Sequence, residues 1–241
     1  SPHLHWGEIS PHQVWRAATA CMEAGGAAAT GAEALLREVA WLDFNHHLLF
    51  HFPTIATSNW REQFDRFPWR DDPGGLAAWQ RGQTGYPLVD AGLRELWHTG
   101  FMHNRVRMIV GSFLIKDLMI DWRDGEAWFW DTLVDADMAN NAGNWQWVAG
   151  SGADASPFFR IFNPVTQGEK FDPAGDYVRR WVPELTGMPQ KWVHKPWSAP
   201  AEILAESGVV LDQTYPAPIV DHGMARNRAL DAYKALRNEI T

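Results

Sequence analysis

Hydrophobic side chains recur three or four residues apart along most of this chain, whereas strict apolar–polar alternation never extends beyond four residues. The first spacing is typical of amphipathic helices and the second of β-strands. The pattern predicts helices over residues 11–24, 30–52, 87–100, 103–121, 125–138, 176–181 and 225–240. We therefore expect an all-α fold.

Capping residues support two of these helices. Ser10 followed by Pro11 is a typical helix start, because serine caps the first turn and proline fits the first helical position. Thr30 and Glu33 have the spacing of a capping box, and Pro53 should end the helix that follows.

The centre of the chain divides into buried and irregular parts. Residues 103–121 are mostly apolar, which predicts a helix buried on most sides. Glycine, serine and proline punctuate residues 143–171, and residues 186–220 are similarly broken. Both segments are predicted to be largely irregular.

Composition excludes several classes of protein. The chain has 241 residues, a formal net charge of −8 and one cysteine, Cys21. A single cysteine rules out a disulfide framework within the chain, and no apolar run is long enough for a membrane span. The acidic balance argues against a general polyanion binder, although residues 151–200 carry six basic against five acidic side chains.

Three histidines raise the question of a metal. His47 and His51 lie four residues apart and His46 is adjacent. A catalytic zinc ion needs three ligands, and no glutamate follows His47 as in the HExxH motif. We interpret these histidines as structural and predict no metal site.

Residues 134–147, "VDADMANNAGNWQW", combine two acids, side-chain amides and two indoles. A packed core does not need the amides, and a solvent-facing surface does not need the indoles. The chain has 15 tryptophans, more than a core alone requires. This mixture indicates a site for a flat ligand that is polar at its edge and is light-absorbing or redox-active.

Charged residues upstream leave two interpretations open. Asn104, Arg105 and Arg107 stand at the start of the predicted buried helix, which favours either an anion site or arginines paired with nearby acids. Asp135 and Asp137 suit an acid–base pair, or an Arg–Asp pair that braces a cofactor.

Four segments carry a family resemblance. They are "TGYPLVDAGLRELWHTGFMHNRVRMIVGSFLIKDLMIDWRDGEAWFWDTLVDADMANN" (84–141), "WQW" (145–147), "FFRIFNPVTQGEKFDPAGDYVRRWVPEL" (158–185) and "YPAPIVDH" (215–222). Their order and spacing resemble the C-terminal flavin-binding domain of DNA photolyases and cryptochromes, most closely class I-type cyclobutane pyrimidine dimer photolyases. The resemblance covers nearly the whole chain. It implies that residues 1–241 form a helical domain holding FAD, a fragment of a protein whose N-terminal α/β antenna domain precedes it.

The resemblance also assigns cofactor residues. Ser1 matches the end of the family's phosphate-binding loop. Arg107 and Asp135 match an ion pair beside the isoalloxazine ring, and Asp137 matches a residue at the flavin edge. Asn141 matches the residue that faces flavin N5. An asparagine at this position resembles the repair enzymes of the family.

Further residues match the family's positions for electron transfer and for DNA binding. Trp145, Trp122 and Trp69 resemble the family's three-indole chain, which carries electrons from the surface to the excited flavin. Residues resembling the lesion pocket are Glu38, Trp41, Asn104, Met108 and Trp147. Residues resembling contacts to the DNA backbone are Arg105, Arg160 and Gln167.

Some positions depart from the family pattern. Leu35 and Phe101 stand where tryptophan is common, and Leu42 stands where arginine is usual. The segment "ANNAGNW" also differs from the commoner "AANNGGW". These changes bear on flavin or DNA contacts.

The resemblance implies light-driven repair of cyclobutane pyrimidine dimers by a monomeric, cytoplasmic, DNA-associated enzyme. Its partner is UV-damaged DNA, and its antenna chromophore would bind the absent domain. One alternative is a cryptochrome, a blue-light receptor with the same flavin site. The other is a helical nucleic-acid-binding module without flavin or enzymatic activity.

Overall fold

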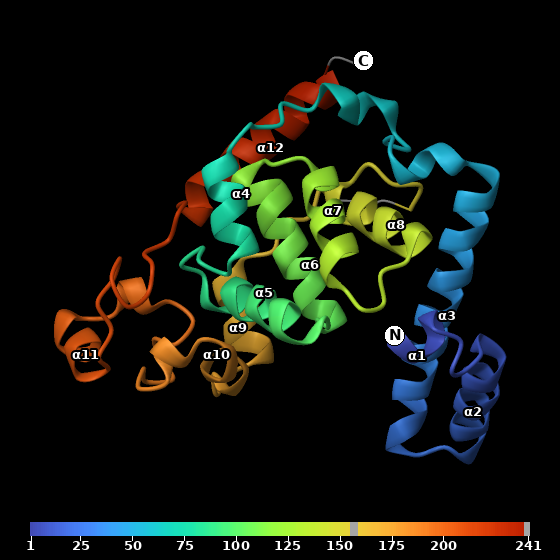
Figure 1. Cartoon of the computed structure of the whole chain (residues 1–241), viewed down its shortest axis with the longest axis horizontal. Helices are drawn as coiled ribbons and strands as arrows, with labels where there is room; N and C mark the ends of the chain where they lie inside the picture. Colours follow the sequence, from blue (N-terminus) through green and yellow to red (C-terminus); the bar gives the residue numbers. More distant parts are fainter. Residues whose placement is uncertain (155–158, 239–241) are drawn as a thin grey trace.

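The computed structural model describes residues 1–154 and 159–238, and in this part the regular structure is helical (Figure 1). The α-helices are α1 (Pro2–His5), α2 (Pro11–Ala24), α3 (Ala27–His51), α4 (Pro73–Gln80), α5 (Pro87–Thr99), α6 (Asn104–Ser112), α7 (Trp122–Thr132), α8 (Met138–Ala149), α9 (Pro164–Phe171), α10 (Asp176–Trp181), α11 (Ala201–Glu206) and α12 (His222–Asn238). Short 3₁₀ turns lie at Pro53–Ala56, Glu62–Arg66, Pro183–Leu185 and Pro196–Ser198. The predicted all-α fold is confirmed.

Several predicted helices form where their capping signals placed them. The Ser10 side chain accepts a hydrogen bond from the Gln13 amide at the start of α2. Helix α5 begins at Pro87 and ends at Thr99, and Gly100 caps it with a φ of 68°, the left-handed conformation that favours glycine. Helix α10 spans the predicted residues. The predicted C-terminal helix forms as α12 within the described residues; positions 239 and 240 lie outside them.

The prediction of a capping box at Thr30 is wrong. Helix α3 already begins at Ala27, so Thr30 lies inside it. The reason is the glycine pair before it: Gly25 and Gly26 both have positive φ, and two residues suffice to reverse the chain and start the new helix.

The predicted helix over 103–121 is divided in two. Helix α6 passes at Phe113–Leu118 into a π-helical segment, which stops at Met119 with a φ of 59°. The apolar residues are buried as expected, but apolar periodicity does not distinguish α from π geometry.

The helix predicted over 125–138 is also wrong. The segment predicted to be irregular over 143–171 is helical at both ends, in α8 and α9, and irregular in the described residues between them. Helix α7 starts at Trp122 and ends at Thr132, and α8 runs from Met138 through the glycine to Ala149. Asp137 starts α8 by accepting a hydrogen bond from the Asn140 amide. The start of α8 is therefore set by its polar cap, which the spacing of apolar residues does not reveal.

The main core gathers around α6. Buried side chains from α4 to α8, among them Trp79, Phe113, Trp122, Phe129 and Trp145, form one hydrophobic cluster. Figure 1 shows α6 at the centre of this group, with α5 and α7 on either side of it. Helices α2 and α3 pack against each other, and α3 also meets α8.

A buried carboxylate organises the turn before α5. Asp90 accepts hydrogen bonds from the Thr84 amide and hydroxyl (both 2.7 Å) and from the Tyr215 hydroxyl (2.6 Å). Burial raises the pKa of Asp90, against the opposing effect of these donors. A Cβ on Gly85 would lie 2.4 Å from the Ala217 carbonyl oxygen, so only glycine fits there. The hydrogen bond from Tyr215 to Asp90 and the close approach of Gly85 to Ala217 thus attach the segment "TGYPLVDAG" to the C-terminal region.

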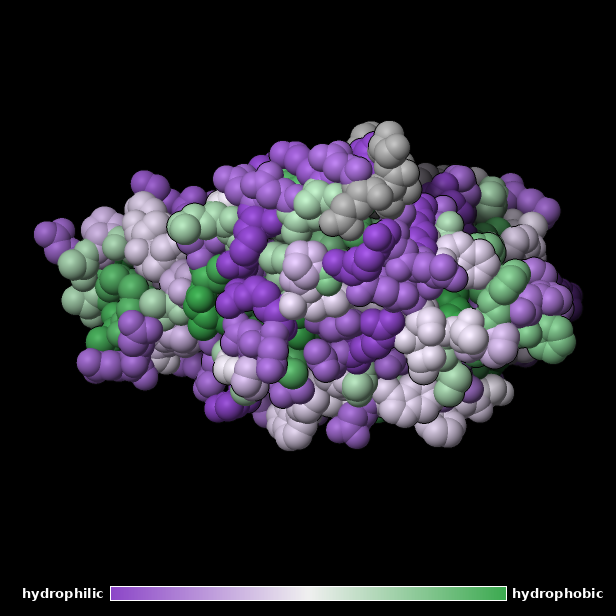
Figure 2. Space-filling model, turned by 90° about the horizontal axis from the view of Figure 1, so that it is seen from above, coloured by the Kyte–Doolittle hydropathy of each residue, from purple (hydrophilic) through white to green (hydrophobic). Residues whose placement is uncertain are grey.

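The C-terminal region adds two smaller cores. One surrounds Val178, Leu185 and Tyr215, and the other joins Phe64 and Phe67 to Leu236 of α12. Seen from above, hydrophilic side chains form a broad band across the middle of the surface (Figure 2). None of the helices described has both the length and the apolar character that crossing a bilayer demands.

Candidate functional site

An ion pair links α6 to the loop before α8. The Arg107 guanidinium lies 3.2 and 3.4 Å from the two carboxylate oxygens of Asp135, and its Nε donates to the Met102 carbonyl at 2.7 Å. The Ser1 backbone nitrogen lies 2.8 Å from an Asp135 carboxylate oxygen. Burial alone would raise the pKa of Asp135, but the Arg107 guanidinium with its hydrogen bonds, joined by the Ser1 nitrogen, holds it below its ordinary value. The carboxylate is therefore charged and fixed.

The start of α8 presents a second carboxylate. Asp137 Oδ1 accepts from both the backbone and side-chain nitrogens of Asn140, at 2.8 and 2.7 Å. Its Oδ2 lies 3.3 Å from His46 Nε2 on α3. The acid therefore joins α3 to α8, and His46 has a structural partner, as we interpreted it. Within the described ranges, no three histidine, cysteine or acidic side chains gather closely enough to hold a metal ion.

Asn141 is held in one orientation by Glu126 of α7. The Asn141 amide nitrogen donates to the Glu126 carboxylate at 2.8 Å and to its carbonyl oxygen at 2.9 Å. Both acceptors face the NH₂ group, so Asn141 offers a ligand only its carbonyl oxygen. Burial raises the pKa of Glu126, and the hydrogen bond from Asn141 opposes this rise. Sequence reasoning missed Glu126, because only the packing of α7 on α8 reveals it.

The three predicted relay indoles belong to one part of the core. Trp122 and Trp145 are buried in the main cluster, and Trp69 packs against it. The Trp145 ring lies between two glycines: Cβ atoms built on Gly111 and Gly125 would come within 3.4 and 2.2 Å of it. These glycines give α6 and α7 the space that the indole needs.

Trp41 and Trp147 line one hollow although they are about a hundred residues apart. This hollow, which is open to solvent, also involves Phe44, Asn45 and Gly143. Asn45 donates to Asn140 at 3.0 Å, which ties this face of α3 to α8. Glu38 lies one turn before Trp41 on α3 and is exposed, outside the residues lining the hollow.

The predicted pocket residues of α6 lie elsewhere. Asn104 is the exposed first residue of that helix, and Met108 packs against the main core. Neither lines the hollow between Trp41 and Trp147. The Arg105 guanidinium stands 4.4 Å from the centre of the Phe171 ring of α9. The structure thus brings together two of the five predicted pocket residues.

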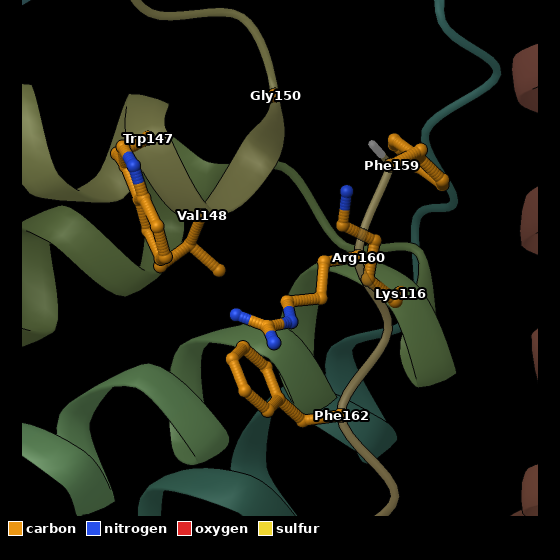
Figure 3. A pocket seen from close by; sticks show the side chains of 7 residues that line it. All are labelled: Lys116, Trp147, Val148, Gly150, Phe159, Arg160 and Phe162. Atoms are coloured by element: carbon orange, nitrogen blue, oxygen red, sulfur yellow. The ribbon is translucent and has the colours of Figure 1, made fainter. Parts of the chain in front are cut away.

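A second hollow also has Trp147 in its lining, together with Lys116, Arg160 and Phe162 (Figure 3). Arg160 projects toward it beside the Phe162 ring, at 5.2 Å from the ring centre. The buried Lys116 ammonium donates to the Ala149 carbonyl at 2.9 Å, at the end of α8. Burial lowers the pKa of Lys116 well below its usual value.

The last predicted DNA contact lies on a neighbouring helix. Gln167 belongs to α9, and its Oε1 atom is buried without a partner among the residues described. Because α9 also carries Phe171, which packs on Arg105, Gln167 and Arg105 belong to the same region of the molecule.

A buried glutamine completes the site and was also missed. Gln146 Nε2 donates to the carbonyl oxygens of Ile55 and Ser58 at 2.7 and 2.9 Å, and its Oε1 accepts from the Trp60 amide at 2.9 Å. These bonds attach the segment after α3 to α8. In the sequence, the only signal was a polar residue between two tryptophans.

Comparisons with known proteins identify the family of this chain. Residues 35–235 match the family described as FAD binding domain of DNA photolyase. The chain is 61% identical over 237 residues to a deoxyribodipyrimidine photo-lyase of Agrobacterium fabrum, covering 98% of this chain and 49% of that protein. It is 41% identical to Cryptochrome-2 of Arabidopsis thaliana, over 98% of this chain and 40% of that protein.

A solved structure is equally similar. The crystal structure of a bacterial class III photolyase from Agrobacterium tumefaciens superimposes with a TM-score of 0.93 at 60% identity, covering 99% of this chain and 49% of that one. The chain thus spans about half the length of these relatives. The family match over residues 35–235 and these identities establish that the chain belongs to the photolyase/cryptochrome family and contains its FAD-binding domain.

Proposed function

We propose that this chain is the catalytic domain of a DNA photolyase that splits cyclobutane pyrimidine dimers with light. The observation that carries the proposal is the hollow between Trp41 and Trp147. It lies against α8, the helix that also carries Asn141 and Trp145. A lesion site and an electron-transfer site would therefore share one element.

The residues present fit FAD. Asn141 offers a carbonyl oxygen, the correct partner for the ring N–H of a reduced flavin. The charged pair of Arg107 and Asp135 provides donors and acceptors for the polar edge of the ring, and Asp137 is a further carboxylate two residues along the chain. When bound and reduced, FAD supplies a light-absorbing one-electron donor.

The hollow suits a flipped-out pyrimidine pair. Two indoles give flat apolar walls, and enzymes that act on a base inside a duplex reach it by flipping it out of the stack. Glu38 lies on the same face of α3 as Trp41, where its carboxyl group can hydrogen-bond a pyrimidine edge. Asn104 and Met108 of α6 do not line the hollow. The two indoles and Glu38 would bind and orient the substrate and exclude water.

Basic side chains around the hollow would hold the DNA backbone. Arg160 stands beside Trp147, and Arg105 is braced on Phe171 near Gln167. Trp145, Trp122 and Trp69 would pass electrons inward from the surface when the flavin needs reduction. Repair itself would not need them, because the electron used to split the dimer returns to its donor.

The 60% identity to a class III photolyase favours class III over the class I assignment predicted from sequence motifs. A cryptochrome is the second candidate, supported by the 41% match to Cryptochrome-2. The match to the FAD-binding family leaves no observation in favour of a flavin-free module.

A repair assay on the full-length, FAD-loaded protein tests the proposal. Pre-reduced enzyme is mixed with an oligonucleotide carrying one thymine dimer, and dimer loss is measured in blue light and in darkness. We expect light-dependent repair that falls severalfold, up to about tenfold, in Glu38→Ala with flavin absorbance retained. Trp145→Phe should slow photoreduction of oxidised enzyme yet repair normally once reduced.

The outcomes separate the candidates. Flavin photoreduction without dimer loss would indicate a cryptochrome. Unchanged repair in Glu38→Ala would remove Glu38 from the substrate site. Equal loss of photoreduction and repair in Trp145→Phe would contradict a relay role for that indole.

A further inference from the structure

The indole N–H of Trp122 has a hydrogen-bond acceptor that its two predicted relay partners lack. Trp122 Nε1 donates to the Asn59 side-chain oxygen at 2.9 Å. Within the described part of the chain, the N–H groups of Trp69 and Trp145 have no partner. The middle member of the relay is therefore in a different electrostatic setting from the members on either side.

Asn59 is itself fixed on several sides. It is buried, and its amide nitrogen donates to the Asp65 carboxylate at 2.7 Å. The backbone around it is attached to Gln146 of α8, through the Ser58 carbonyl and the Trp60 amide. The amide oxygen consequently has little freedom to turn away from Trp122.

We propose that Asn59 is a positioning residue that keeps the proton on Trp122 while this indole carries positive charge during electron relay. This inference rests on the proposed function of the three tryptophans. When bound and excited in its oxidised form, FAD would supply the oxidant for this relay: Trp145 would lose one electron, Trp122 would return one to Trp145, and Trp69 would return one to Trp122. For the last transfer to restore Trp122, its indole must keep its N–H proton.

The chemistry of the acceptor supports this role. An oxidised indole is a much stronger acid than a neutral one, so a basic partner would remove its proton. An amide oxygen accepts a hydrogen bond but hardly accepts a proton, and hydrogen bonding to a charged form stabilises it. The Asp65 carboxylate, one hydrogen bond further out, strengthens the effect without touching the indole.

Nearby charges act in both directions. The Arg123 guanidinium lies 4.8 Å from the Trp122 ring centre and disfavours positive charge there. Asp121 pairs with Arg123 at 2.9 Å, and Asp65 lies 3.9 Å from it. The positive charge of Arg123 is therefore largely balanced. Asn59, itself bonded to Asp65, makes the direct contact with the N–H group of Trp122.

Flash spectroscopy on the full-length, FAD-loaded protein tests the inference, because the indole radical cation and the neutral indole radical absorb differently. In Trp69→Phe the positive charge should stop at Trp122 and give the radical cation. Adding Asn59→Asp, which supplies a base, should convert the signal to the neutral radical.

In the otherwise unchanged protein, Asn59→Leu should lower the yield of long-lived charge separation roughly five- to tenfold. Asn227→Leu on α12 makes the same chemical change at an exposed site and should leave the yield unchanged.

A measurement without light checks the hydrogen bond itself. In ¹⁵N-labelled protein, the Trp122 indole resonance, assigned by its loss in Trp122→Phe, should move upfield and exchange faster with solvent in Asn59→Leu. A neutral radical in Trp69→Phe alone, or an unchanged yield in Asn59→Leu, would overturn the role of Asn59. Absence of any flash-induced indole radical in the unmodified protein would instead overturn the proposed relay.

Discussion

At the scale of single residues, the site depends on polar side chains that α-helices bring into fixed pairs. Asp135 is nearly inaccessible, with 4% of its side chain exposed, and its charge is balanced mainly by Arg107. A buried charge that loses its partner is costly, because neither water nor another ion replaces that partner. The pair therefore stabilises the fold as well as shaping the cofactor site.

Replacing Asp135 with asparagine should lower the free energy of unfolding by about 2–3 kcal/mol at neutral pH. The folded-state pKa of Asp135 lies below its ordinary 3.8, so its contribution is present above 3.8 and is lost as pH falls through the folded value. Denaturant unfolding at pH 7 and in acid should show that the difference in free energy of unfolding between the two proteins shrinks as the pH falls. Asp231→Asn, at an exposed pair on α12, should change stability by less than about 1 kcal/mol. A gap that is independent of pH would contradict this account of the ion pair.

The sequence identified one partner in several of these pairs and missed the other. Family resemblance pointed to Asn141 and Trp122, but Glu126 and Asn59, which orient them, have no motif of their own. Asn59 lies 63 residues before Trp122, and only the folding of the segment after α3 onto α8 joins them. Residue identity predicts chemistry, whereas partners across elements depend on packing.

At the scale of elements, the packing of α7 on α8 decides where Trp145 lies. Sequence spacing predicted one helix over 125–138, because the apolar residues on both sides of the break have compatible spacing. The structure ends α7 at Thr132 and starts α8 at Met138, which folds α8 back against α7. The cap at Asp137 makes this possible, and it places Asn141 opposite Glu126.

Gly125 of α7 leaves room for the Trp145 ring of α8. A Cβ there would lie 2.2 Å from the Trp145 ring and 2.6 Å from Leu114, so Gly125→Ala should force the indole to move. We expect a loss of about 1–3 kcal/mol in stability and slower flavin photoreduction. Thermal unfolding and photoreduction rates measure both effects.

Gly31→Ala is the matched control for this prediction. Gly31 lies in α3, with open space around its Cα, so alanine there should be neutral or stabilise the helix by up to about 1 kcal/mol. If Gly125→Ala were as well tolerated as Gly31→Ala, the contact between α7 and Trp145 would be looser than the structure indicates.

At the scale of the whole molecule, the sequence predicted the all-α class and the family, but not the shape of the surface. The net charge of −8 disfavours contact with a phosphate backbone. The hollow nevertheless has an arginine near it, because the chain folds Arg160 beside Trp147, while Arg105 packs on Phe171 of α9. A global charge count cannot reveal this local arrangement, since it depends on which loops meet at the hollow.

This arrangement predicts how DNA binding responds to salt. Each phosphate neutralised by an arginine adds about 0.9 to the slope of log affinity against log salt. Arg160→Gln should weaken binding of a dimer-containing duplex in the dark, lower that slope by about one, and affect undamaged duplex equally. Arg16→Gln, an exposed position on α2 away from α9 in Figure 1, should leave affinity and slope unchanged. Because a phosphate contact carries no information about the lesion, a loss of affinity confined to damaged DNA would instead place Arg160 against the flipped-out bases.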